Sequence, residues 1–210
     1  MVRYLGSGDP VFYIHDDMER AEALYEGSSK DFTLAVIDDA DWNRDLSPWR
    51  AEKVFKDGED FSGGAEAYLN RLINVIIPEA EAGQGLRPLK RGIIGYSLAG
   101  LFALYAYINS DFFDFSGSVS GSLWFDGWKE YLKEKIPALK IKGKIYLSVG
   151  DNEAHARNRR MKCVEENTRF TEELLRNAGC TTIFELNRGG HFQDTELRVQ
   201  KCIEWLKGGV

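Results

Sequence analysis

Short apolar runs alternate with segments of helical periodicity along the first part of the chain. Residues 11–14 and 32–37 form two such runs, each closed by acidic residues, and residues 18–25 between them are compatible with a helix. Residues 65–81 place apolar side chains at three-and-four spacing, which is typical of an amphipathic helix. The pattern therefore predicts a β-α-β unit, followed by a helix that covers one face of a sheet.

The same alternation continues to the end of the sequence. Because the strands are apolar on both sides of the pleat and alternate with helices, the pattern predicts an α/β fold with a mostly parallel sheet between two helical layers. No repeat or linker interrupts it, so a single domain is expected over residues 1–210. The later strands are predicted at residues 91–95, 115–119, 144–149 and 181–186, and the later helices at residues 98–108, 124–135, 167–178 and 195–206.

Ser97 stands at the corner between a predicted strand and a predicted helix, with small residues two positions to either side. The segment reads Gly95-Tyr-Ser-Leu-Ala-Gly100, which is the arrangement of a nucleophile elbow. Strand and helix pass closely at such a corner, so the residues at positions 95 and 99 must be small. Ala99 replaces the usual second glycine and is the next smallest residue. Ser97 is therefore the candidate nucleophile.

A serine nucleophile needs a base, and the chain has three histidines to serve, His15, His155 and His191. His15 precedes the elbow and His155 closely follows Glu153, whereas His191 lies in the loop between the last predicted strand and the last predicted helix. The chain order serine, acid, histidine of the α/β-hydrolase triad favours His191 as the base.

The acid of such a triad should follow the strand at residues 144–149. Glu153 is preferred, because it lies three residues beyond Gly150 and its loop lets the carboxylate reach the imidazole. Asp151 is the alternative acid, although it can instead cap the turn through nearby backbone N–H groups, and Asp194 is a third candidate. A Ser-His pair without a supporting acid also stays open.

An oxyanion formed during acyl transfer needs two backbone N–H donors. Leu98, which follows the nucleophile at a helix N-terminus, is expected to supply one of them. The second is expected from the loop after residues 11–14, at Met18, with Asp17 as the alternative. Ionised Asp16 and Asp17 would oppose a developing negative charge, so their carboxylates are expected to face away or to be hydrogen-bonded.

Composition and charge narrow the class of protein. The 210 residues carry 27 Lys and Arg against 33 Asp and Glu, a formal net charge of -6, which does not favour nucleic acid as a partner. Three cysteines without a C-x-x-C pair predict neither a disulfide framework nor a zinc knuckle, and the N-terminal residues lack a signal-peptide pattern, so a cytoplasmic protein is expected.

The uncharged run at residues 92–110 is interpreted as a buried strand and helix, so no membrane is expected as a partner. Acidic clusters at residues 15–17 and 38–41 lack the spacing of a metal site, and neither a metal nor a cofactor is expected.

Residues 95–106 resemble the nucleophile segment of the putative-esterase family of α/β hydrolases, which includes esterase D, feruloyl esterases, siderophore esterases and mycolyltransferases. The similarity extends from about residue 10 to residue 205, with matching segments at residues 11–18, 41–49, 118–124, 150–153 and 184–192. It implies an α/β-hydrolase fold, here a minimal three-layer sandwich with no cap domain, residues 2–5 as a candidate edge strand, and an open site. Asp17 departs from the family pattern, because relatives usually carry a glycine in this loop.

Four tryptophans fall on or beside the segments expected at the edge of the site. Trp42, Trp49 and Trp124 are expected to bind the substrate, with Trp128 one helical turn beyond Trp124. Together these features predict a serine esterase that forms an acyl-enzyme with a small-molecule ester and needs no cofactor. An acyltransferase with the same groups and a noncatalytic binding or scaffold protein of this fold stay as alternatives, and the oligomeric state is left open.

Overall fold

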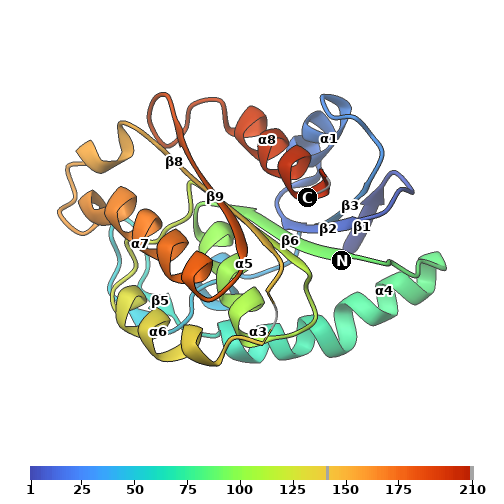
Figure 1. Cartoon of the computed structure of the whole chain (residues 1–210), viewed down its shortest axis with the longest axis horizontal. Coiled ribbons are helices and arrows are strands. Elements are labelled where there is room, and N and C mark those ends of the chain that lie inside the picture. Colours follow the sequence, from blue (N-terminus) through green and yellow to red (C-terminus); the bar gives the residue numbers. More distant parts are fainter. Residues whose placement is uncertain (141, 209–210) are drawn as a thin grey trace.

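The computed structural model describes residues 1–140 and 142–208, and its centre is a seven-stranded sheet (Figure 1). The strand order is β1-β3-β2-β6-β7-β8-β9, and β1 is antiparallel to its neighbour while the other pairs are parallel. The strands are β1 Val2–Leu5, β2 Val11–His15, β3 Thr33–Ile37, β6 Arg91–Tyr96, β7 Phe115–Val119, β8 Lys144–Gly150 and β9 Thr181–Asn187. The predicted α/β fold with a mostly parallel sheet is confirmed, and residues 2–5 form its antiparallel edge strand.

Helices cover both faces of this sheet. One face carries α1 Met18–Glu26 and α8 Thr195–Lys207, which contact each other over the apolar core around Phe12 and Ile14. The larger core on the opposite side is closed by α3 Ala65–Arg71, α4 Ile77–Gln84, α5 Leu98–Asn109, α6 Trp128–Lys135 and α7 Val164–Asn177 (Figure 1). Helix α5, directly behind the candidate nucleophile, is buried along most of its length, which fixes the turn that precedes it.

Three local features differ from the sequence prediction. The helix predicted at residues 65–81 contains a π-helical turn, Leu72–Ile76, just before Pro78, whose nitrogen cannot donate to the helix ladder. Helix α6 begins at Trp128 rather than at Trp124, because Gly127 adopts a left-handed conformation with φ of 82°. The short helix α2 Trp42–Asp45 and the hairpin of β4 Arg50–Ala51 and β5 Phe61–Ser62 are too short to leave a periodic pattern.

The uncharged run at residues 92–110 is accounted for by β6 and α5, as predicted. Within the described part of the chain, no helix has the length and apolar character needed to cross a bilayer. The loops that follow β6, β7, β8 and β9 gather at one end of the sheet, which is the end where parallel α/β sheets bind ligands.

Candidate active site

Ser97 occupies a strained turn between β6 and α5. Its φ of 59° and ψ of -122° are rare for a residue with a side chain. The turn requires glycine at position 95, because a Cβ there would lie 2.3 Å from the backbone C and O atoms of Ala99. Ala99 itself is accommodated and buried, so the departure at this position leaves the tight turn intact. The sharp corner lifts the Ser97 hydroxyl out of the sheet and turns it toward a cavity.

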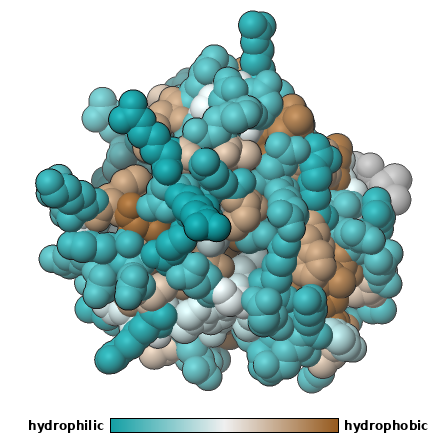
Figure 2. Space-filling view, turned by 90° about the vertical axis from the view of Figure 1, so that its left-hand side faces the viewer, coloured by the Kyte–Doolittle hydropathy of each residue, from teal (hydrophilic) through white to brown (hydrophobic). Residues whose placement is uncertain are grey.

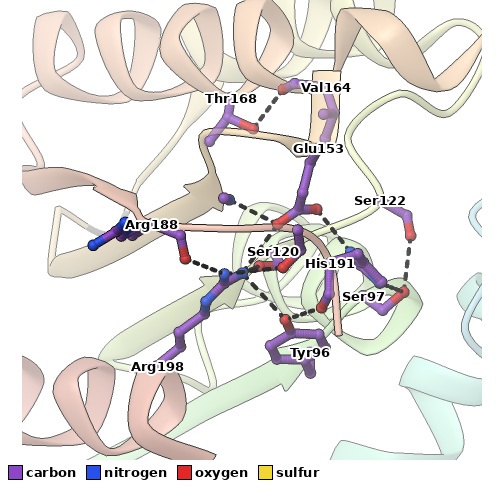
Figure 3. Close-up of polar contacts among 12 residues, drawn as sticks. Tyr96, Ser97, Ser120, Ser122, Glu153, Val164, Thr168, Arg188, His191 and Arg198 are labelled. Atoms are coloured by element: carbon purple, nitrogen blue, oxygen red, sulfur yellow. Dashed lines mark hydrogen bonds and ion pairs between the residues drawn. The ribbon is translucent and has the colours of Figure 1, made fainter. Parts of the chain in front are cut away.

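Ser97, His191 and Glu153 form a continuous chain of hydrogen bonds across three loops (Figure 3). The Ser97 Oγ atom lies 3.0 Å from His191 Nε2, and His191 Nδ1 lies 2.7 Å from Glu153 Oε2. Glu153 belongs to the turn Glu153–His155 after β8, and His191 lies between β9 and α8. This geometry lets the imidazole accept a proton from the hydroxyl while the carboxylate holds its other nitrogen.

Glu153 is a buried carboxyl whose second oxygen also has partners. The Gly150 N–H donates to Glu153 Oε1 over 2.7 Å, and the same oxygen accepts from Arg198 over 3.1 Å. Burial alone would raise the pKa of Glu153, but the hydrogen bond and the charge of His191 hold that pKa below its ordinary value. The carboxyl is therefore held in its ionised form beside the imidazole.

Asp151, the alternative acid, has a different partner. Its Oδ1 atom accepts a hydrogen bond of 2.7 Å from the Gly189 N–H, and its own N–H donates to the Asn187 carbonyl. Asp151 therefore ties the acid loop to the histidine loop. Asp194, the third candidate, adopts a left-handed conformation just before α8 and accepts the Arg198 N–H at its carbonyl.

The two predicted oxyanion donors lie in different surroundings. Leu98 is the first residue of α5, where N–H groups have no partner within the helix, and it borders a cavity shared with Ser97. Met18 begins α1 and lines the neighbouring depression instead. The Asp17 side chain accepts the Arg20 N–H and caps α1, so the helix begins at Met18. The structure does not bring Met18 into the Ser97 cavity.

Both carboxylates of this first loop are hydrogen-bonded. Asp17 caps α1, and Asp16 Oδ1 accepts the Asp17 N–H over 2.9 Å. Burial raises the pKa of Asp16, opposed by the charge of Arg20. His15 and Asp16 line the Ser97 cavity, so the cavity meets the first loop at these two residues. The Asp17 N–H donates to Asp16 Oδ1 and is therefore already occupied.

Three cavities with shared lining residues lie near Ser97, and Ser97 lines two of them. The one that contains His191 and Ser97 has a volume of about 330 Å³, and it shares Phe55 and Trp124 with a neighbour of about 420 Å³ and with a smaller one of about 150 Å³. The smallest also contacts Ser97 and Leu98, next to a predominantly apolar wall. Ser97 therefore lies at the border of two cavities, and each can receive one half of a substrate.

Of the four tryptophans, two line these cavities and two do not. Trp42 is partly exposed and Trp124 is nearly buried, and both border the cavities at Ser97. Trp49 packs on Phe125 and donates its indole N–H to the Asp126 carbonyl, outside the described cavities. Trp128 is buried and donates to Thr171 Oγ1. The prediction that Trp49 binds substrate is therefore not supported, because its ring is used to attach the β4–β5 segment to α6.

The sequence reasoning missed three residues around the site. Ser122 Oγ lies 3.4 Å from Ser97 Oγ, Phe55 borders all three cavities, and Arg198 contacts Glu153. Arg198 left a signal, because its spacing from Cys202 and Leu206 places it on the buried stripe of α8. Phe55 and Ser122 left none, since both lie in irregular segments.

The side of the molecule that carries these loops is mostly hydrophilic, with smaller apolar patches between the polar side chains (Figure 2). Phe55 and Phe192 are among the large apolar side chains exposed on the surface, at 62% and 87%. Across residues 1–140 and 142–208, no group of three or more His, Cys, Asp or Glu side chains is arranged to hold a metal ion.

A serine on a strained strand-to-helix turn, at the carboxyl end of a mostly parallel sheet, defines the class of α/β hydrolases. The family model described as "Putative esterase" matches residues 2–193. The chain belongs to this esterase family, as the sequence resemblance implied, and it is a hydrolase.

The chain is also similar to three individual proteins. The chain is 25% identical over 218 residues to the uncharacterized protein YbbA of Bacillus subtilis, covering 96% of this chain and 86% of that protein. It shares its fold with the siderophore hydrolase EstA of Aspergillus nidulans, with a TM-score of 0.74, 19% identity and coverage of 96% and 83% of the two chains. It also shares its fold with an IroE-like serine hydrolase of Shewanella oneidensis, with a TM-score of 0.78, 18% identity and coverage of 94% and 70%.

Proposed function

We propose that this protein is a serine esterase that hydrolyses carboxylic esters through an acyl-enzyme on Ser97, with His191 as the base and Glu153 as the supporting acid. The observation that carries the proposal is the hydrogen-bonded chain from Ser97 Oγ through the imidazole to Glu153, beside a cavity of about 330 Å³. Its geometry meets the requirements of nucleophilic catalysis, because base and nucleophile lie within hydrogen-bond distance and a third group orients the base.

In the proposed mechanism, His191 Nε2 takes the Ser97 proton as Oγ attacks the ester carbonyl carbon. The imidazolium that forms is stabilised by Glu153, whose ionised carboxylate is held ready by its hydrogen bonds. His191 then returns the proton to the departing alkoxide, which leaves as an alcohol. Water, deprotonated by the same imidazole, attacks the acyl-enzyme, releases the carboxylic acid and regenerates the Ser97 hydroxyl.

Negative charge on the carbonyl oxygen requires donors near Ser97. The proposal assigns one to the Leu98 N–H, which points out of the first turn of α5 and is favoured by the helix dipole. The cavity meets the first loop at its His15 and Asp16 end, so the second donor is to be sought there rather than at Met18.

The shape of the cavities supports a preference for small acyl groups. The limb beside Ser97 and Leu98 has a volume of about 150 Å³, and a cavity of that size holds a molecule about as large as benzene. Each methylene that cannot be buried forfeits about 0.8 kcal/mol of binding. The larger limbs, walled by Phe55 and Trp124, favour bulky aryl or hydroxy-acid groups on the other half of the ester.

A series of p-nitrophenyl esters from acetate to palmitate tests this function. We expect steady release of p-nitrophenol that is lost in Ser97→Ala, with kcat/KM highest for the short acyl chains. An added alcohol acceptor measures how the acyl-enzyme partitions between water and alcohol, and hydrolysis should dominate. Turnover confined to the alcohol acceptor would instead define an acyltransferase, and a maximum at palmitate would contradict the small acyl limb.

A further inference from the structure

Arg198 is a buried arginine directly behind the candidate active site. It lies in the first turns of α8, and its side chain is only 1% exposed. In the described structure it borders none of the cavities around Ser97. A charge buried this completely must be matched by hydrogen-bond partners, so the positions of those partners show what the arginine holds together.

The partners of Arg198 belong to the two loops that carry the acid and the base (Figure 3). One terminal nitrogen donates to Glu153 Oε1 over 3.1 Å. The other donates to the carbonyl of Arg188 over 3.1 Å and to the carbonyl of Gly190 over 3.0 Å. These two carbonyls come before His191 in the loop after β9. The planar guanidinium fixes the distance between the two loops, because its donors point in set directions.

The same guanidinium also reaches the strand that leads to the nucleophile. It donates to the hydroxyl of Tyr96, the last residue of β6, over 3.4 Å, and to Oγ of Ser120, which follows β7, over 2.9 Å. The Tyr96 hydroxyl in turn donates to the His191 carbonyl oxygen. The segments that carry Ser97, His191 and Glu153 therefore converge on one buried cation.

The contact with Glu153 leaves the reacting side of the carboxyl free. Arg198 and the Gly150 N–H both bind Oε1, whereas Oε2 remains for the imidazole. An arginine that gripped both oxygens would compete with His191 for its orienting bond. This one-sided contact distinguishes a residue that positions a carboxylate from one that only pairs with it.

We propose that Arg198 is a positioning residue for this esterase, which holds Glu153 and the His191 loop in register with Ser97. The inference rests on the proposed function. A displacement of about 1 Å in such a group can cost about 10²-fold in rate, so the loss of the guanidinium fork should lower kcat by about that factor. Because Arg198 does not face the substrate, KM should change little.

The decisive variant is Arg198→Lys, which keeps the charge but replaces a planar fork with a point donor. We expect kcat for p-nitrophenyl acetate to fall by about 10²-fold with KM nearly unchanged. Arg198→Ala should lose at least as much, and millimolar guanidinium chloride, far below denaturing concentrations, should restore part of that kcat while sodium chloride does not. In a Glu153→Gln background the Arg198→Lys change should have a much smaller further effect.

Arg91→Met is the matched control, because Arg91 also pairs with a buried glutamate but lies at the other end of the sheet. It should lose stability and keep its kcat. A folded Arg198→Lys protein with wild-type kcat, or a loss that is fully additive with Glu153→Gln, would overturn the positioning role. A wild-type enzyme that does not turn over these esters, or turnover that persists in Ser97→Ala, would instead overturn the proposed esterase mechanism.

Discussion

Two arginine-glutamate pairs lie at opposite ends of the central sheet. At the amino end, Arg91 grips Glu81 with two nitrogens, Nε to Oε1 and a terminal nitrogen to Oε2, each over 2.8 Å. Tyr13 adds a third hydrogen bond of 2.5 Å to the same carboxyl. Both oxygens of Glu81 are therefore occupied, and this pair connects α4 to β6 and β2 without presenting a group to a substrate.

The Arg198–Glu153 pair at the carboxyl end is more deeply buried, but the arginine contacts only one of the two carboxylate oxygens. Arg198 contacts one oxygen of Glu153, and the other oxygen binds the imidazole of His191. The side chains are 1% and 5% exposed, against 28% and 9% for Arg91 and Glu81. A buried ion pair can support the proposed chemistry only when its carboxyl keeps one oxygen for a group that must change its protonation state, and Glu153 does so while Glu81 does not.

Removal of the reacting groups at the carboxyl end should have the largest effect. Ser97→Ala and His191→Ala should each lower kcat for ester hydrolysis by about 10⁶-fold, because either change removes nucleophilic attack. Both residues lie in loops at the edge of the sheet, so the unfolding transition should hardly move. Steady-state kinetics and circular dichroism melts on both variants test this, and a loss of only tenfold would mean that another group is the nucleophile.

Glu153→Gln should come next, with a loss of about 10⁴-fold in kcat, because the amide can neither orient His191 correctly nor stabilise its cation. Asp151→Asn is the matched control two residues away. It keeps an oxygen that can accept the Gly189 N–H, so most of the activity should remain. The two variants are to be compared at equal folded fraction, and the reverse order of losses would transfer the role of the acid to Asp151.

At the amino end, Arg91→Met should affect stability rather than rate. It leaves Glu81 nearly buried without its cation, which typically costs about 3–5 kcal/mol. Urea unfolding at pH 7 measures the loss, and kcat measured well below the unfolding transition should equal that of the wild type. A fall in kcat without a loss of stability would show that the two ends of the sheet are not separable in this way.

The smallest of these effects is expected at His15, a buried side chain near the candidate site. It concerns the pH dependence of the free energy of unfolding. Burial lowers its pKa to about 4, against the opposing charges of Asp45 and Asp39. Between pH 6.5 and pH 4, His15 is protonated in the unfolded chain and neutral in the folded protein. The contribution of neutral His15 to the free energy of unfolding is therefore complete at pH 7 and is lost as the pH falls. From pH 7 to pH 4, the wild type should lose about 3 kcal/mol more than His15→Asn in urea unfolding experiments. Equal losses would mean that His15 does not carry this pH dependence.

Much of the fold could be predicted, because buried strands and amphipathic helices impose a period on the sequence. The strand at residues 115–119 has the same limits in both prediction and structure. What could not be predicted has local causes, such as the left-handed Gly127 that delays α6 and the π-helical turn before Pro78. The two-residue strands β4 and β5 are defined by their pairing with each other and are too short to leave a pattern in the sequence.

The candidate site could be predicted from the sequence at residues with reactive side chains, but not at residues whose position depends on packing or on a helix cap. Ser97, Glu153 and His191 each follow a strand, so the topology could be used to bring them together. Met18 and Trp49 could not be placed correctly, because a helix cap and an aromatic contact decide where they lie. Trp49 contacts a residue far along the chain, whereas the cap before Met18 is a local hydrogen bond, and neither leaves a periodic pattern in the sequence.

Covalent labelling shows whether the Ser97 hydroxyl is an activated nucleophile, as we propose. The protein is to be treated with a fluorophosphonate, and the labelled peptide identified by mass spectrometry in the wild type and in Glu153→Gln. We expect stoichiometric labelling on Ser97, much slower labelling in Glu153→Gln, and none in Ser97→Ala. Labelling of another residue, or an unreactive Ser97 in the folded wild-type protein, would contradict it.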